Sequence, residues 1–147
     1  MGVLRLTRTV DVARRQDEVF DFVADLRNHL SWHRHLTAVE LVGSGSIGPG
    51  SEFRAVFRGY GPVGVRIAQY QRPWRLTFAV TGRTDFTYEF DFAVRDGGTS
   101  IETVVEQPLR GPAWLVAPLW RALARRDFLR RGEELRAALE RRPGPGP

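Results

Sequence analysis

The sequence predicts an α+β protein, in which a curved antiparallel sheet of about seven strands surrounds a long C-terminal helix and two short helices follow the first strand. Residues 43–107 alternate between apolar and polar side chains, with turns rich in glycine and proline between the runs, which is typical of antiparallel strands. Residues 111–142 are rich in Leu, Ala, Arg and Glu without alternation, which favours a helix. An apolar sheet face must be covered, and this helix is the only predicted element long enough to cover it.

The first strand and the short helical region are predicted from residues 3–36. Residues 3–12 alternate imperfectly and are rich in β-branched residues, which favours a strand. One face of this strand carries Leu4, Leu6, Arg8 and Val10. The next segment has apolar residues at helical spacing, with Asp17 and Glu18 in the first turn, where the helix dipole favours acids. All three histidines follow in "RNHLSWHRHL", residues 27–36, before a second strand that begins in "TAVELVG".

The most regular predicted strand spans residues 84–94. Its apolar face consists of Phe86, Tyr88, Phe90, Phe92 and Val94. Its polar face consists of Asp85, Thr87, Glu89 and Asp91. This strict alternation predicts a half-buried strand. "RDGG" then predicts a hairpin turn and "TSIETVVEQ" a last strand.

The C-terminal helix is expected to start at Pro118 or to be kinked there. A helical apolar stripe is formed by Ala117, Ala124, Phe128, Gly132, Leu135 and Leu139. Residues 1–142 are expected to form a single domain, and the proline- and glycine-rich residues 143–147 a disordered tail.

Composition excludes several classes of protein. The 147 residues contain no Cys, so disulfides, thiolate metal ligands and thiol nucleophiles are excluded. No apolar run approaches the roughly 18 residues of a membrane helix, and the N-terminus lacks a signal-peptide pattern, so we expect a cytoplasmic protein. The net charge of +5 arises from residues 108–147, which carry nine Arg against four acidic residues, while residues 1–107 are balanced. No P-loop or Rossmann fingerprint is present, and no cofactor is expected.

Four segments occur in an order typical of one superfamily: "VDVARRQDEVFDFVADLRNHLSWHRHL", "GSGSIGPGSEF", "YQRPWRLTF" and "DGGTSIETVVE". On these segments, residues 3–140 resemble the SRPBCC superfamily, with its START-like or helix-grip fold, and within it the polyketide cyclase/dehydrase group. The resemblance implies that an apolar small molecule binds between the sheet and the C-terminal helix. Some members of the group catalyse cyclisation, dehydration or hydrolysis, but no universal catalytic residue can be carried over, so the fold alone does not give the activity.

The three histidines do not have the pattern of a metal site. Zinc needs three or four convergent ligands, whereas His33 and His35 would point in different directions on a helix, so no metal is expected. Surface or pocket-rim histidines are one interpretation, and a histidine that acts on a bound ligand is the other. His33 is the candidate for such chemistry, because it neighbours Trp32, whose indole should turn inward.

Tyr88 is the second candidate for proton transfer, because it interrupts a run of inward phenylalanines and a buried phenol needs a hydrogen-bond partner. It could equally be a core tyrosine whose hydroxyl reaches water or a carbonyl. A few polar groups in an apolar cavity are typical of a small-molecule site. The predicted ligand-binding residues are Trp32, Phe53, Phe57, Val65, Phe78, Tyr88, Phe90, Thr103, Gln107, Trp120, Ala124 and Phe128.

Three functions therefore remain open. The first is an apolar-ligand protein that catalyses cyclisation or dehydration of a polycyclic or polyketide-like molecule, and the second is a non-catalytic carrier of such a molecule. The third is a module that contacts an anionic membrane or an acidic protein through the basic helix. The arginines concerned are Arg121, Arg125, Arg126 and Arg130, which could also be an ordinary solvated face. Nucleic acid is not an expected partner, since the basic residues are not interleaved with aromatic ones on a sheet.

Overall fold

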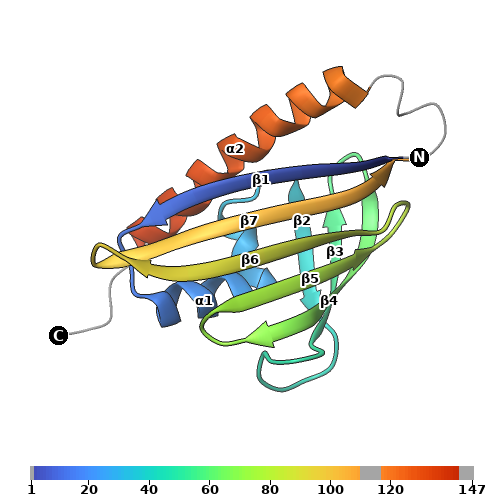
Figure 1. Cartoon of the computed structure of the whole chain (residues 1–147). Helices are drawn as coiled ribbons and strands as arrows, with labels where there is room; N and C mark the ends of the chain where they lie inside the picture. The colour runs from blue at the N-terminus through green and yellow to red at the C-terminus, as the bar shows by residue number, and fades with distance from the viewer. Residues whose placement is uncertain (1, 110–116, 143–147) are drawn as a thin grey trace.

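One antiparallel sheet organises the chain (Figure 1). The structure is a computed structural model that describes residues 2–109 and 117–142. Within those residues, seven strands pair in the order β1-β7-β6-β5-β4-β3-β2, which confirms the predicted fold class. The elements are β1 (Gly2–Val12), α1 (Gln16–Ala24), the short helix η1 (Leu26–Ser31), β2 (Leu36–Leu41), β3 (Glu52–Phe57), β4 (Gly61–Gln71), β5 (Arg75–Thr81), β6 (Phe86–Arg95), β7 (Gly98–Leu109) and α2 (Ala117–Arg141). The predicted tail, residues 143–147, lies outside the described residues.

The alternation along the strands separates a buried face from a solvent face, as predicted. On β5 the buried side chains are Leu76, Phe78 and Val80, and on β6 Phe90 and Phe92 are 2% exposed.

Val94 differs from the prediction, because its side chain is 66% exposed. It lies near the β6–β7 turn, where Asp96 and Gly97 have φ values of 47° and 79°, whereas Phe92 is covered by Phe20 of α1 at a ring distance of 5.2 Å. The strand therefore continues beyond the part of the sheet that α1 covers.

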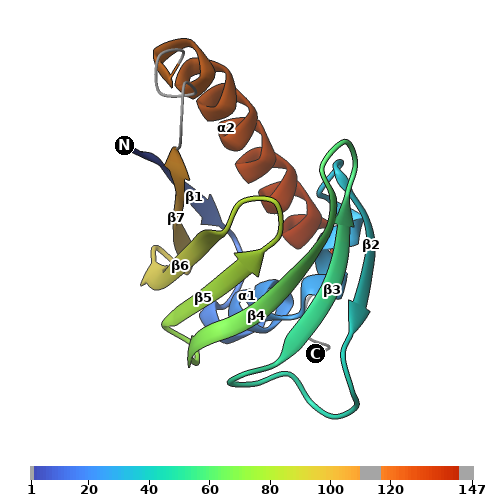
Figure 2. The ribbon, with the colours of Figure 1, turned by 90° about the vertical axis from the view of Figure 1, so that its right-hand side faces the viewer.

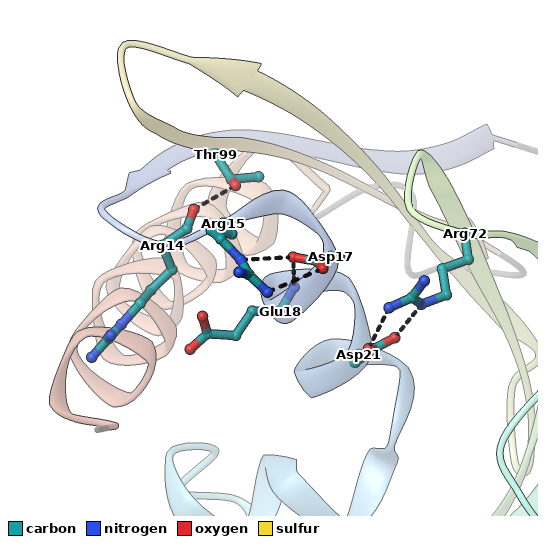
Figure 3. A network of polar contacts seen from close by, with 7 residues as sticks. All are labelled: Arg14, Arg15, Asp17, Glu18, Asp21, Arg72 and Thr99. Atoms are coloured by element: carbon teal, nitrogen blue, oxygen red, sulfur yellow. Dashed lines mark hydrogen bonds and ion pairs between the residues drawn. The ribbon is translucent and has the colours of Figure 1, made fainter. Parts of the chain in front are cut away.

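Helix α1 is held against the sheet at both ends (Figure 3). At its start, the Thr99 hydroxyl donates to the carbonyl of Arg14 at 2.7 Å. Further along, Arg72 from the β4–β5 turn donates to both carboxylate oxygens of Asp21 at 2.7 and 2.8 Å. Both partners of this pair are exposed, so it orients α1 more than it stabilises the fold. The main contribution comes from apolar side chains of α1, of which Val19, Phe20 and Val23 are fully buried.

Helix α2 crosses the open side of the curved sheet (Figure 2). Its C-terminal half packs into the core with Leu135 and Leu139 almost fully buried. Its N-terminal end projects away from the sheet in both views, and there Leu119 and Leu123 are 68% and 57% exposed. The predicted single helix is confirmed, and Pro118 lies in its first turn.

Gly132 lets α2 approach β1 closely. A Cβ atom on Gly132 would lie 2.9 Å from Val10 Cγ2 and 3.0 Å from Arg8 Cδ, which is closer than van der Waals contact allows. A glycine inside a helix costs about 1 kcal/mol relative to alanine. Here that cost is offset by the close packing of α2 on the first strand.

We expect Gly132→Leu to lower the free energy of unfolding by about 1–3 kcal/mol, because the new side chain would force α2 away from β1. Urea unfolding measures this change. The matched control is Ala137→Leu, which adds the same side chain at an exposed position of α2 and should change the free energy by less than about 0.5 kcal/mol. A Gly132→Leu protein as stable as the control would contradict the close packing.

Candidate functional site

A cavity lies between the sheet and α2, and it has two adjoining compartments. The inner compartment has a volume of about 40 Å³ and the outer one about 360 Å³. They share the lining residues His33, Phe57, Tyr88, Phe128 and Arg131, which therefore mark the boundary between them.

The inner compartment is deep and mostly apolar. Beyond the shared residues it is lined by Arg8, Leu26, His29, Trp32, Leu36, Val65, Phe78, Val80 and Phe90. These side chains come from β1, η1 and its flanks, β2, β4, β5 and β6. A space of this size holds a few water molecules or one small chemical group, not a polycyclic molecule.

The outer compartment is large enough for a small-molecule ligand, since such sites span roughly 300–1,000 Å³. Beyond the shared residues it is lined by Leu4, Leu6, His35, Arg58, Tyr60, Phe86, Val105, Gln107, Ala124 and Asp127. Ala124 is a small residue on the helix wall, opposite aromatic side chains of the sheet, and it leaves room between them.

Most residues selected from the sequence lie on this cavity. The candidates for chemistry, His33 and Tyr88, line both compartments. The predicted ligand-binding residues on the lining are Trp32, Phe57, Val65, Phe78, Tyr88, Phe90, Gln107, Ala124 and Phe128. That they contact a ligand stays a prediction.

Three selected residues are not placed on the lining. Phe53 is 1% exposed and belongs to the core. It lies on the same face of β3 as Phe57, nearer the start of the strand. Thr103 of β7 is also 1% exposed, and its hydroxyl has no hydrogen-bond partner. The side chain of Trp120 lies outside the part of the chain that the structure describes.

Arg8, His29 and Arg131 line the inner compartment, although the sequence did not identify them as site residues. Arg8 lies on the inward-facing side of β1, between Leu6 and Val10. This position in the alternation is the feature of the sequence that could have identified Arg8 as a site residue. Arg131 lies three residues after Phe128 in α2 and therefore on the same helix face.

Arg8 is a buried cation with no carboxylate partner among the described ion pairs. Its residue surface is 6% exposed, and its Nη1 donates to the Phe128 carbonyl at 2.8 Å. Its guanidinium carbon lies 4.2 Å from the centre of the Phe128 ring, a cation–π contact. Burial lowers the pKa of Arg8 to about 10, so the side chain is still charged at neutral pH.

The second buried guanidinium, that of Arg131, has a carboxylate partner. Arg131 Nη2 forms an ion pair with Asp127, four residues earlier in α2. The Asp127 side chain is 46% exposed, whereas that of Arg131 is 13% exposed. The positive partner thus faces the cavity interior and the negative partner the outer compartment and solvent.

The histidines have different roles. His29 is a satisfied core residue, because its Nε2–H donates to the carbonyl of Val23 at 2.9 Å, and burial lowers its pKa to about 4. Burial, with the nearby charge of Arg131, lowers the pKa of His33 to about 3, and its Nδ1 atom has no partner. In the described residues no three His, Cys, Asp or Glu side chains converge as a metal site requires.

These pKa values limit the chemistry available to the cavity without a ligand. An imidazole with a pKa of about 3 is a weak base at neutral pH, so His33 is a poor general base in this state. Burial raises the pKa of Tyr88, which keeps its phenol protonated and able to donate a hydrogen bond.

The basic face of α2 is separate from the cavity. Arg121, Arg125, Arg126 and Arg130 are exposed along the helix, beside the exposed Leu119. None of the described helices is both long and apolar enough to cross a membrane.

The fold and the cavity define a helix-grip protein, and the family follows from the sequence. Residues 3–140 match the family described as "Polyketide cyclase / dehydrase and lipid transport", so the chain belongs to this family. No curated protein matches the chain in sequence.

Solved structures show the same fold at low sequence identity. The Zhui aromatase/cyclase from Streptomyces sp. R1128 superposes with a TM-score of 0.75 at 15% identity, and the match covers 96% of each chain. Ara h 8.0201 gives a TM-score of 0.68 at 14% identity, covering 94% of this chain and 98% of that one. The di-domain ARO/CYC protein BexL from the BE-7585A biosynthetic pathway gives 0.67 at 20% identity, covering 96% of this chain and 51% of BexL.

We expect the free energy of unfolding to fall as the pH is lowered from about 7.5 to about 5. The unfolded chain binds protons at His29 and His33 near pH 6.5, but the folded protein does so only near pH 4 and pH 3. Below about pH 6.5 the unfolded state therefore holds more protons, and each histidine should contribute a slope of roughly 1 kcal/mol per pH unit. Urea unfolding at several pH values measures this slope.

The matched variant is His29→Gln, whose amide can still donate to the Val23 carbonyl but does not titrate. It should show a shallower dependence of stability on pH. If the variant retained the full slope of the wild type, His29 would not be buried in its neutral form.

Proposed function

We propose that this cytoplasmic protein binds an apolar, ring-containing small molecule, polycyclic or polyketide-like, between its sheet and α2. The observation that carries the proposal is the outer compartment, whose volume of about 360 Å³ fits one such molecule. Its aromatic walls and the small side chain of Ala124 favour flat rings. Membership of a family described by cyclases, dehydrases and lipid transport supports the same class of ligand.

Catalysis of cyclisation or dehydration is a second candidate, because His33 and Tyr88 border both compartments and could transfer protons to a ligand that lies across them. A carrier without turnover is the alternative that the low basicity of His33 favours.

Native mass spectrometry of protein purified from its own host would identify a co-purified molecule. If the protein is an enzyme for that molecule, Tyr88→Phe or His33→Ala should reduce turnover and leave the affinity unchanged. If the protein is a carrier, the wild type should show no turnover.

We expect Ala124→Trp to raise the Kd for the neutral fluorescent dye phenylnaphthylamine at least about tenfold, because the indole would occupy the outer compartment. A fluorescence titration measures the Kd. The control is Ala122→Trp, two residues earlier in α2 at an exposed position, which should leave the Kd unchanged. Equal effects of the two substitutions, or no dye binding to the wild type, would contradict ligand binding in this compartment.

The exposed end of α2 supports an independent proposal, in which it contacts an anionic membrane surface. Arg121 and Arg125 lie there close to the exposed Leu119 and Leu123. Basic residues beside apolar ones are attracted to anionic lipid. We expect some pelleting with phosphatidylserine vesicles that is lost as salt is raised. No salt-sensitive pelleting would identify this face as an ordinary solvated surface.

A further inference from the structure

The lining of the inner compartment constrains the charge of the ligand, which the proposed function leaves open. We propose that Arg8 and Arg131 bind an anionic group, a carboxylate or phenolate oxygen, that the ring-containing ligand carries. The inference rests on the proposed function, since it concerns the same cavity. It adds that the ligand class is an apolar ring system with one acidic group.

Positive charge is in excess at the cavity. Two guanidinium groups line the inner compartment, and the only carboxylate on either compartment, among the described residues, is that of Asp127. Asp127 pairs with Arg131 and is itself half exposed. Arg8, at 6% exposure, has a carbonyl and an aromatic ring as its partners, and neither neutralises a charge. A buried charge without a counterion is costly, and an anionic ligand would supply the counterion.

The inner compartment also has a set of unused hydrogen-bond donors. Buried side-chain nitrogens without a partner are Arg8 Nε, Trp32 Nε1, His33 Nδ1 and Arg131 Nη1. All four residues line the inner compartment. The guanidinium and indole nitrogens can only donate, and the imidazole nitrogen donates in one of its tautomers. Buried donors are normally satisfied, so this cluster is suited to an oxygen acceptor with several lone pairs.

Arg8 is held in place before any ligand binds. Its Nη1 is fixed on the Phe128 carbonyl, and its plane lies over the Phe128 ring. The missing side chain of Gly132 provides the space for its Cδ atom. A donor that is already ordered loses little conformational entropy when it binds an anion.

A purely structural role, in which Arg8 links β1 to α2, accounts for only part of these observations. That link uses Nη1 and leaves Nε without a partner. It also leaves Nη1 of Arg131, a second residue of the same lining, without a partner. Anion binding uses both groups.

The two volumes indicate how such a ligand would lie. The inner compartment, at about 40 Å³, has room for a carboxylate but not for rings, while the outer compartment accommodates rings. Arg131 borders both compartments, so the acidic group would enter the inner one and the rings would remain in the outer one.

The test compares naphthoate with its neutral isostere naphthamide by isothermal titration calorimetry at neutral pH. For the wild type we expect a Kd for naphthoate at least about tenfold lower than that for naphthamide, since a charge-assisted contact is lost in the amide. Arg131→Met should remove this preference while naphthamide still binds. Asp127→Asn removes the neutralising carboxylate and should strengthen naphthoate binding.

The matched control is Arg130→Met, which makes the same change of charge at the adjacent, exposed position of α2 and should leave the preference intact. Arg8→Met should also abolish the preference, and if that variant fails to fold, the variants of Arg131 and Asp127 still decide. Equal affinity of the wild type for both compounds, or a preference that survives Arg131→Met, overturns the anion site but leaves the proposed function standing. Failure of both compounds to bind overturns the proposed function and this inference with it.

Discussion

The close packing of α2 on β1 is the constraint on which the site depends. Gly132 allows the two elements to approach, and the Arg8 side chain fills the contact by reaching the carbonyl and the ring of Phe128. If α2 lay further from the sheet, Arg8 would lose these partners. The tight contact at Gly132 thus fixes the part of α2 that carries Phe128 and Arg131, which line both compartments.

The inner and outer compartments have different properties, and a ligand site needs both kinds. The outer compartment offers volume and apolar surface, and the inner one offers buried hydrogen-bond donors in a small space. Apolar surface gives affinity without much selectivity, whereas a few buried polar groups discriminate between ligands of similar shape. Selection among hydrophobic molecules would then be made by the residues around Arg8 and Arg131.

The sequence could predict the sheet, the helices and part of the lining, because period-two alternation and the apolar helical stripe directly reflect burial. It could not separate Phe53 from Phe57, which share a face of β3, because the curvature of the sheet and the position of α2 determine where the core ends. Arg8 appeared only as an irregularity in an apolar pattern, and Arg131 was one of many arginines in a basic helix. Charged residues are usually solvated, so their inward orientation becomes evident only when the opposite wall of the cavity is known.

The two arginines of the inner compartment lie far apart in the sequence, on β1 and on α2. The site can therefore form only after α2 has been synthesised and has packed against β1. A molecule bound there would contact both β1 and α2. It would therefore favour the protein with α2 packed on the sheet over the protein with α2 detached, and this effect would grow with ligand concentration. Cellular abundance of the folded protein would then rise and fall with the supply of its ligand.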